Sequence, residues 1–370
     1  MLIKLLKNSF STLTNQKRPL YLDMQATTPI DFRVLDAMLP YLTIDYGNPH
    51  SKTHLYGINA DKIIEKSRLQ VACLLNAEQD EIIFNSGASE SNNAALLGLS
   101  QYHFENNTGK NHIITIKTEH KTVLEACKYI EKKYNFKVDY LDVDSNGLIS
   151  LENLEQKINQ YTLVVSVMSL NNEIGVLQDL QKIGLLCEQK NAIFHTDSAQ
   201  AIGKIDLDKK LNLLPIIHGG GQEKGLRSGT LSPPMVAALG EACSAAQREM
   251  QNDNKYIKKL YDRMFRRIFS KIDDVKLNGD PQQRYFGNLN VSFKDVLSSS
   301  IMDIIKNSVA LSAGAACSDE PSYVLSAIKV PEEYAFGSIR IGVGRFTTFE
   351  EVDFLVDILI ESVKQCRQNN

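Results

Sequence analysis

The stretch that decides the fold is HIITIKTEHKTVLEACKYIEKKYNFKVDYLDV, which spans residues 112–143. Apolar and β-branched residues open it and predict a strand at His112–Ile116, and a later apolar run predicts a strand at Val138–Val143. The residues between them, 121–134, form an amphipathic pattern of helical period. A helix that connects two strands at this spacing is typical of a βαβ unit, so we expect the two strands to be parallel.

The same alternation of short apolar runs and amphipathic stretches continues on both sides. It predicts an α/β fold whose larger part holds a mostly parallel sheet. Such sheets bind ligands at the carboxyl ends of their strands, so the residues that follow each strand are the candidates for a site. Further strands are predicted at Glu81–Phe84, Leu163–Met168 and Ala192–Thr196, and further helices near 91–104, 151–160 and 180–190.

The pattern changes after residue 231. The Ser-Pro-Pro segment at 232–234 is expected to break the chain, and a long helix is predicted after it, to about Ile272. Strand-like VKLNG, NLNVSF and SIRIGV follow, and a closing helix is predicted from Thr348. We therefore expect an N-terminal extension at residues 1–18, a large domain at 19–231 and a smaller α+β domain at 232–370.

Composition narrows the classes of partner and compartment. A net charge of -3 gives no reason to expect a nucleic-acid or membrane partner, and no apolar run is long enough to cross a bilayer. Six cysteines without a CxxC pair fit neither a disulfide framework nor a zinc site, so we expect no metal and a reducing, cytoplasmic setting. Residues 1–18 are basic and free of acids; we favour a plain extension over an organelle-targeting peptide.

The first motif that follows a predicted strand is SGASES, residues 86–91. Small residues let backbone N–H groups approach an anion, and the start of a helix favours negative charge. A phosphate is therefore the expected ligand. An ordinary helix cap at Ser89 or Ser91 explains the same residues.

Three more candidates follow strands. A carboxylate at the end of a buried strand is costly unless a positive group meets it, and a protonated pyridine nitrogen would suit Asp197; a turn-capping aspartate is the alternative. His120 could stack on a planar ring or move protons, although a lone histidine is more often structural. The amides of Asn171 and Asn172 could bond ring substituents, or they could belong to a turn.

Two candidates lie in the C-terminal part. Cys317 stands among small residues in SAGAACSDE, where an exposed thiol could ionise and act as a nucleophile; a buried, inert cysteine is the alternative. Arg340 lies on a predicted strand and could clamp a carboxylate with two hydrogen bonds. An exposed ion pair is the simpler explanation for this arginine.

Together and in this order, the motifs resemble the cysteine desulfurases of the NifS and IscS kind, a group within the class-V aminotransferases. The resemblance covers about residues 19–365. It implies pyridoxal phosphate (PLP) fold type I and a homodimer that moves sulfur from L-cysteine to iron–sulfur cluster assembly or other acceptors. The matching segments are YLDMQATTP (21–29), GNPHS (47–51), SGASES, KTEHK, NNEIG, HTDSAQAIGK, HGGG, RSGT, SAGAACS, EPSYVL and SIRIGVGRFTT.

The resemblance implies a role for each matching residue at the cofactor. Ser89 and the neighbouring amide of Ala88 would hold the PLP phosphate, together with Thr230 from the partner subunit. Asp197 would pair with the pyridine nitrogen, and His120 would stack on the ring.

Further roles follow for the ring oxygen and for the substrate. Asn172 and Gln200 would bond the ring oxygen and its surroundings. Arg340 would receive the carboxylate of the substrate cysteine. Cys317 would attack the substrate sulfur and carry it away as a persulfide.

The sequence departs from the family after residue 207. In the family a further strand ends in Ser-x-His-Lys, whose lysine forms the Schiff base, and another strand follows before HGGG. Here only residues 208–217 separate Leu207 from His218, and Ser-x-His-Lys occurs nowhere in the chain. None of the nearby lysines is expected to substitute: Lys204, Lys209, Lys210 and Lys224.

The missing segment has consequences for structure and chemistry. Two interior strands of the family's sheet are expected to be absent, which leaves the strand Ala192–Thr196 with an unpaired edge that only Leu211–Ile217 could cover. Without its lysine the cofactor loses its covalent tether and a proton shuttle. The stretch between Cys317 and EPSYVL is also shorter than is usual in the family.

The missing Ser and His would contact the phosphate in the family, so PLP binding is expected to weaken. We therefore expect a divergent, desulfurase-like protein whose activity is impaired or absent and which lacks the covalent tether to PLP. Three other interpretations stay open. The chain could be a working, unusual desulfurase, or a non-enzymatic subunit that pairs with an intact homologue, a sulfur acceptor or an iron–sulfur scaffold. It could also be a gene-decay product that folds poorly.

Overall fold

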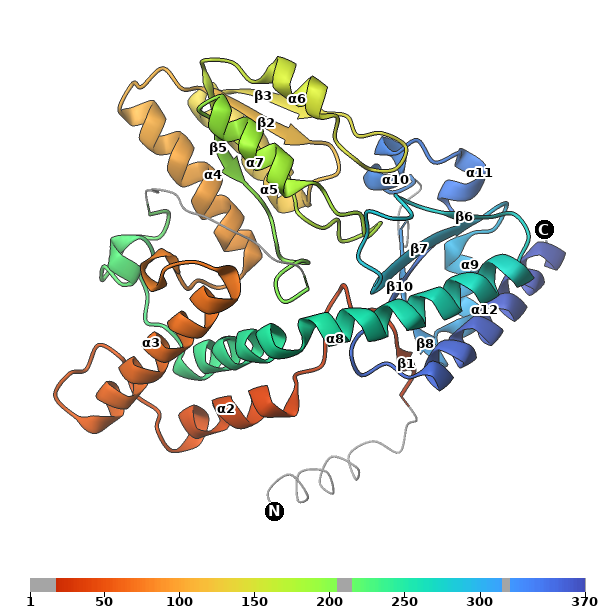
Figure 1. The fold of residues 1–370 in the computed structure, drawn as a ribbon, viewed down its shortest axis with the longest axis horizontal. Helices are drawn as coiled ribbons and strands as arrows, with labels where there is room; N and C mark the ends of the chain where they lie inside the picture. Colours follow the sequence, from red (N-terminus) through yellow and green to blue (C-terminus); the bar gives the residue numbers. More distant parts are fainter. Residues whose placement is uncertain (1–17, 205–214, 315–319, 370) are drawn as a thin grey trace.

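The computed structural model describes residues 18–204, 215–314 and 320–369 of the chain. Two sheets lie in two parts of the molecule, and one long helix, α8 (Pro233–Lys271), runs along both parts (Figure 1). Near its start α8 packs on α2 (Phe32–Thr43) and α3 (Leu55–Leu75), and near its end it packs on α12 (Phe349–Asn369). The proposed domain boundary at residue 231 therefore falls just before a helix that both parts share.

The first sheet confirms the mostly parallel α/β prediction. Its strands are ordered β3-β2-β4-β5, and every pairing within it is parallel. The helices α4 and α5 pack on one face, and α6 and α7 on the other. The strands are β2 (His112–Ile116), β3 (Lys137–Leu141), β4 (Thr162–Ser166) and β5 (Ile193–His195), and the helices are α4 (Ala88–Glu105), α5 (Lys121–Tyr134), α6 (Leu151–Lys157) and α7 (Leu180–Gln189).

Local signals explain why α5 has the predicted bounds. The Nδ1 atom of His120 accepts a hydrogen bond from the backbone N–H of Thr122 and caps the start of the helix. At the other end Asn135 takes a left-handed conformation (φ 56°, ψ 36°), which asparagine tolerates better than most residues. Val123, Ala126, Cys127 and Ile130 form the buried stripe that packs under β2.

The second sheet is antiparallel, with strand order β6-β7-β10-β9. Its core joins the later turns of α8 to α9 and α12, and the largest fully buried side chain there is that of Phe293. A short parallel pair, β1 with β8, ties the start of the described chain to this part. The remaining elements are β1 (Leu20–Tyr21), β6 (Val275–Leu277), β7 (Asn288–Phe293), α9 (Ser298–Ile305), β8 (Val309–Ala310), β9 (Ser312–Ala313), α10 (Tyr323–Ala327), α11 (Glu332–Ala335) and β10 (Ser338–Gly342).

Two local predictions are wrong. Pro233 and Pro234 do not break the chain, because they occupy the first two positions of α8, where a proline has no hydrogen bond to lose. The predicted strand Glu81–Phe84 is a 3-10 helix, Gln79–Glu81, followed by irregular backbone.

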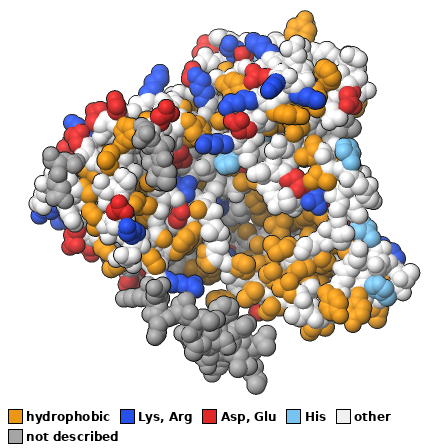
Figure 2. Space-filling view, turned by 180° about the vertical axis from the view of Figure 1, so that it is seen from behind, with side chains coloured by type: hydrophobic (Ala, Val, Ile, Leu, Met, Phe, Trp, Pro, Cys, Tyr) orange, Lys and Arg blue, Asp and Glu red, His pale blue; other side chains and the backbone are white. Residues whose placement is uncertain are grey.

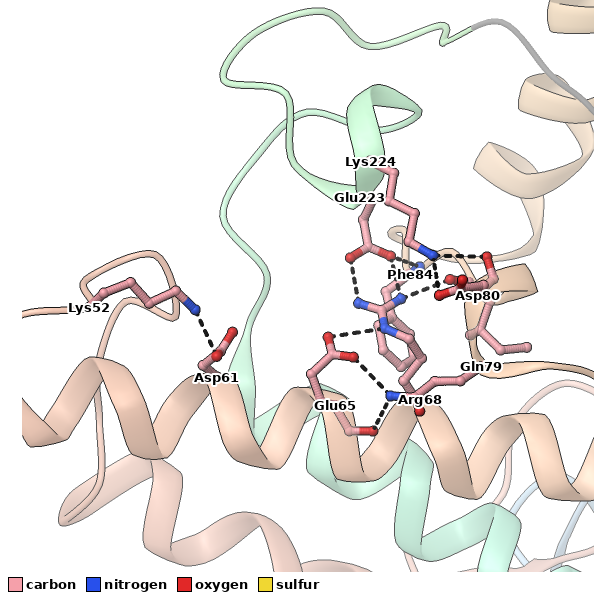
Figure 3. A network of polar contacts seen from close by, with 10 residues as sticks. Lys52, Asp61, Glu65, Arg68, Gln79, Asp80, Phe84, Glu223 and Lys224 are labelled. Carbon is pink, nitrogen blue, oxygen red and sulfur yellow. Dashed lines mark hydrogen bonds and ion pairs between the residues drawn. The ribbon is translucent and has the colours of Figure 1, made fainter.

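Side chains replace strand pairing in that irregular stretch. The backbone N–H of Phe84 donates to Glu223 Oε2 over 2.6 Å (Figure 3). The Ile82 carbonyl accepts from Arg68 Nη1 over 2.8 Å. Glu223 and Arg68 are themselves joined by a buried ion pair of 2.7 Å. A strand would have needed a neighbouring strand, and the described residues provide none there.

The edge of the first sheet at β5 has no strand beyond it among the described residues. Of the segment Leu211–Ile217 that was expected to cover it, residues 211–214 lie outside the described residues. Pro215 and Ile216 line a cavity of about 660 Å³ together with residues of α4 and α5. Within the described parts no helix is long and apolar enough to span a membrane, and no group of three or more metal-binding side chains occurs.

Candidate active site

The carboxyl ends of β2, β4 and β5 converge on Asp197, two residues beyond β5. The Asp197 side chain is buried, its Oδ2 accepts from Asn92 Nδ2 over 2.7 Å, and its Oδ1 accepts from the Ala199 N–H over 2.9 Å. The Asp197 carbonyl accepts from the N–H and the hydroxyl of Ser169, both at 3.0 Å, which fixes the turn after β4 beside it. These contacts hold a carboxylate at the position that the sequence predicted.

Asn92 links this aspartate to His120. Its Nδ2 also donates to Thr122 Oγ1 over 3.0 Å, and that hydroxyl lies 2.9 Å from His120 Nδ1. His120 is exposed. The sequence argument missed Asn92, although a signal existed: Asn92 lies three residues after Ser89 on the same helix, and therefore on the same face.

The first turn of α4 is open to solvent at the predicted phosphate site. Ala88 and Ser89 are both exposed. Gly87 caps the helix with a backbone φ of 145°, a conformation that residues other than glycine rarely adopt. Because Asn92 is bonded to Asp197, this helix start lies next to the aspartate. An anion at the helix start would meet unsatisfied backbone donors and the positive end of the helix dipole.

An ion pair attaches the loop of Thr230 to the same helix. Arg227 Nε donates to Glu90 Oε1 over 2.8 Å, and Glu90 Oε2 accepts from the Ser86 N–H over 2.8 Å. The hydrogen bond from Arg227 is the main reason why the pKa of Glu90 falls to about 2. Thr230, three residues further on, is exposed.

Arg340 reaches the site from the second sheet. Its Nη1 donates to the Asn172 carbonyl over 2.9 Å, and its Nη2 pairs with Asp23 Oδ1 over 2.8 Å and bonds Ser312 Oγ over 3.0 Å. The structure thus brings two predicted residues, Arg340 and Asn172, together across the two parts of the molecule. Asp23 is a second residue that the sequence argument missed.

Gln200 and Cys317 complete the predicted set. Gln200 Nε2 donates to the Gln25 carbonyl over 3.0 Å, so its amide is engaged with the N-terminal segment in this structure. Cys317 lies outside the described residues, and its predicted role stays a prediction.

Glu119 is a further buried carboxyl beside the site. It is fully buried, and its Oε1 accepts from the Met168 N–H over 2.6 Å. Burial, and then the charge of Asp197, raise the pKa of Glu119 well above its usual value.

The comparisons with known proteins fit this geometry. The family model described as aminotransferase class-V matches residues 20–212 and 217–355.

The chain belongs to the class-V aminotransferase family.

Within this family the chain is similar to cysteine desulfurases. It is 47% identical to the Homo sapiens cysteine desulfurase, with 95% of this chain and 83% of the relative covered. It is 45% identical to a probable mitochondrial cysteine desulfurase of Dictyostelium discoideum (96% and 85% covered) and 43% identical to the cysteine desulfurase IscS of Rickettsia felis (96% and 94% covered).

Solved structures give the same fold. A NifS-like protein superposes with a TM-score of 0.87 at 32% identity, covering 94% of this chain and all of the other. The structure titled "SspA in complex with cysteine" superposes with a TM-score of 0.77 at 30% identity and covers 89% of this chain. The chain therefore has the fold type I architecture of the PLP-dependent NifS and IscS proteins.

The class-V match also has a gap. The alignment to the Dictyostelium relative spans 388 residues, more than the 370 of the whole chain, so that relative has residues without a counterpart here. The family match divides into two pieces at residues 213–216, inside the stretch where the family's Ser-x-His-Lys segment is expected.

The described residues fit PLP in its non-covalent contacts. A class-V cofactor would meet an open helix start at Ser89 and a buried carboxylate at Asp197. Buried polar atoms without a hydrogen-bond partner are costly, and a bound ligand satisfies them. Four such atoms occur beside the site. Two belong to the sequence neighbours of Asp197 and two to the bonded pair of Asn172 and Arg340: Thr196 Oγ1, Ser198 Oγ, Asn172 Oδ1 and Arg340 Nε.

Three of the described lysines near the pocket are engaged elsewhere. Lys117 pairs with Asp142, Lys224 pairs with Asp80, and the Lys204 amine lies over the Tyr285 ring. Lys209 and Lys210 lie outside the described residues.

Proposed function

We propose that this protein is a desulfurase-type protein that binds PLP without a covalent tether and binds L-cysteine through its carboxylate, but releases little or no sulfur. The observation that carries the proposal is the contrast between a retained pocket and an absent Ser-x-His-Lys segment. The 43–47% identity to cysteine desulfurases supports the substrate class.

Each retained residue has a task in binding. The N–H groups of Ala88 and Ser89 would bind the phosphate at the start of α4. The Asp197 carboxylate, held by Asn92, would keep a proton on the pyridine nitrogen of the cofactor. His120 would stack on the ring, and Asn172 and Gln200 would bond the ring oxygen and its surroundings. When bound, PLP supplies an aldehyde and an electron-withdrawing ring.

Substrate binding would use Arg340. Its guanidinium already donates to two acceptors, the Asp23 carboxylate and the Asn172 carbonyl. A cysteine carboxylate would compete with Asp23 for the guanidinium, because both are anions that suit its planar fork of donors. Cys317 would remain the acceptor of sulfur.

The chemistry is where we expect the loss. A family lysine holds the cofactor covalently and moves protons during the reaction. Losing a general acid–base group alone costs about 10²–10⁴-fold in rate. We therefore expect sulfide release far below that of an intact relative.

The test is to purify the protein with excess PLP and to measure cofactor content before and after borohydride treatment and denaturation. We expect PLP to bind, to be absent from the denatured chain, and to be lost in Asp197→Asn. Sulfide and alanine production from L-cysteine should be near background, with the Homo sapiens relative as positive control. A borohydride-fixed cofactor with turnover comparable to the relative would overturn the proposal.

We also propose that the protein works as a dimer, either with itself or with an intact homologue. Apolar side chains with more than half of their surface exposed follow one another along α2, its end and the start of α3: Phe32, Ile44, Tyr46 and Leu55. Figure 2 shows that apolar side chains also gather over the rear face of the molecule. Large exposed apolar areas of this kind mark interaction surfaces.

The dimer is tested by light scattering on matched variants. Leu55→Glu should shift the protein to a monomer, while Leu185→Glu, at an exposed leucine of α7, should not. Equal behaviour of the two variants would contradict the proposed surface. Co-purification with an intact desulfurase or a sulfur acceptor would favour the partner role, in which Thr230 would reach the other subunit's phosphate site.

We propose the cytoplasm as the compartment, although one similar protein carries a mitochondrial designation. Imaging a C-terminal fluorescent fusion with and without residues 1–18 tests this. Both forms should be diffuse, and organelle localisation that depends on residues 1–18 would make that segment a targeting peptide.

A further inference from the structure

A second cavity, of about 240 Å³, is lined in part by Gln25, whose carbonyl accepts the hydrogen bond from Gln200. It is bounded by residues 24–31, by the turn that contains Lys204, by the middle of α8 and by residues 343–346. None of the residues predicted to hold the cofactor lines it. Its apolar lining includes Met24, Pro29, Ile202, Ile257, Val343 and Phe346.

Lys204 brings an amine into this cavity. Its Nζ lies 5.1 Å from the centre of the buried Tyr285 ring, and no ion pair joins it to an acid of the described residues. The Asn254 side chain donates to the Lys204 carbonyl over 3.0 Å and fixes the backbone of the turn. Burial lowers the pKa of Lys204 to about 8.

The acids of the cavity are engaged by an arginine instead. Asp31 and Asp253 line the cavity, and Arg345 lies 3.8 Å from the first and 3.4 Å from the second. Arg345 also pairs with Glu249, which Arg33 contacts too. The charged residues that line the cavity are two acids and two bases, so they favour neither an anion nor a cation.

We propose that Lys204 is an imine-forming amine whose cavity takes a small, uncharged aldehyde. Neutral Nζ attacks the carbonyl carbon, a carbon–nitrogen bond forms, and the carbonyl oxygen leaves as water with the two protons of the amine. No oxidant or reductant is required, and the step is reversible. The Tyr285 ring keeps the amine inside the apolar lining. This inference does not depend on the proposed function, because none of the residues assigned to PLP or to the substrate lines the cavity.

The size of the effect follows from the fraction of neutral amine. An ordinary lysine has a pKa near 10.4, so at pH 7.5 the Lys204 amine is neutral on the order of a hundred times more often. Access to a cavity is slower than access to a surface. We therefore expect labelling of Lys204 to be at least about tenfold faster than labelling of the exposed Lys66.

The experiment treats the full-length protein with butanal and cyanoborohydride and maps the labelled lysines by mass spectrometry. Lys204 should label fastest at pH 7.5, with a rate that rises through pH 8 and levels off above it. The exposed Lys66 is the comparison at each pH. Lys204→Arg should remove that label, and Tyr285→Leu should slow it severalfold.

Two results would overturn the inference. One is labelling of Lys204 at the rate of Lys66 across the pH range. The other is loss of the label in Asp197→Asn, which would place the reactive amine in the cofactor pocket. A failure of PLP binding leaves the Lys204 result readable, since butanal requires no cofactor.

Discussion

The two flanks of β5 are built in different ways. On one flank β4 pairs with it along Val164–Ser166, and the turns that follow both strands hold Asp197. On the other flank the described residues offer no strand. The backbone of 82–84, whose side chains pack against α3 and α8, also has no strand neighbour among the described residues and bonds to charged side chains instead. The comparison shows that ion pairs can satisfy a stretch of backbone that has lost its strand neighbours.

The buried pair of Arg68 and Glu223 should therefore have the largest effect on stability. Arg68→Met leaves the Glu223 carboxylate, whose side chain is only 3% exposed, without its main cation, and we expect the free energy of unfolding to fall by about 3–5 kcal/mol. Urea denaturation checks this.

An exposed pair in the same region provides the control (Figure 3). Lys52 and Asp61 pair over 2.7 Å in solvent, so Lys52→Met should cost at most about 1 kcal/mol. A double variant, Arg68→Met with Glu223→Gln, should recover part of the loss. If the Arg68 and Lys52 variants are equally stable, the irregular backbone of 82–84 does not depend on this pair.

The paired flank depends on Asn92. Asn92→Ala removes the donor to Asp197 Oδ2 and to Thr122 Oγ1, and we expect a loss of about 1–3 kcal/mol in unfolding free energy and weaker PLP binding. Asn93→Ala is the matched control, because the Asn93 amide bonds only the Ser89 carbonyl. Equal losses of unfolding free energy in the two variants would mean that the hydrogen bond from Asn92 to Asp197 does not stabilise the protein.

The sequence predicted best the elements whose signals are local. α5 and β7 have the predicted bounds. The caps and the buried stripe of α5 fix the helix, and the strict alternation of polar and apolar residues in NLNVSF fixes the strand. Glu81–Phe84 has the composition of a strand, but pairing depends on neighbours that the local sequence does not encode. The strand prediction for these residues therefore failed because of their tertiary environment and not because of their intrinsic strand propensity.

The site was predictable where the residues follow strands. Asp197, His120 and Asn172 all lie just beyond a strand, as the parallel sheet requires. Asn92 and Asp23 were missed because their partners are 105 and 317 residues away in the chain. Only the fold brings such pairs together. The place of Cys317 stays a prediction.

The pH dependence of the unfolding free energy tests how well β5 shields His195 from water. Burial lowers the pKa of His195 from 6.5 to about 4, so the unfolded chain binds the proton first and stability falls as the pH drops from about 6.5 toward 4. Because β5 is only half-buried, solvent should temper the loss, and we expect about 1–2 kcal/mol between pH 7 and pH 5. His195→Gln should lose less over the same interval. Urea unfolding of both proteins at each pH gives the difference, in which the groups they share cancel. Identical slopes would show that water reaches His195 freely.

Asp23 gives the smallest effect and tests how the two parts of the molecule meet. If Arg340 receives the substrate carboxylate, Asp23 competes with it, and Asp23→Asn should tighten L-cysteine binding about fivefold, or about 1 kcal/mol. Ser312→Ala removes another contact of Arg340 without a change of charge and should leave the affinity nearly unchanged. Calorimetric titration of the PLP-loaded proteins measures both. Unchanged or weaker binding in Asp23→Asn would mean that the guanidinium is held for structure, and that the carboxylate of cysteine binds elsewhere.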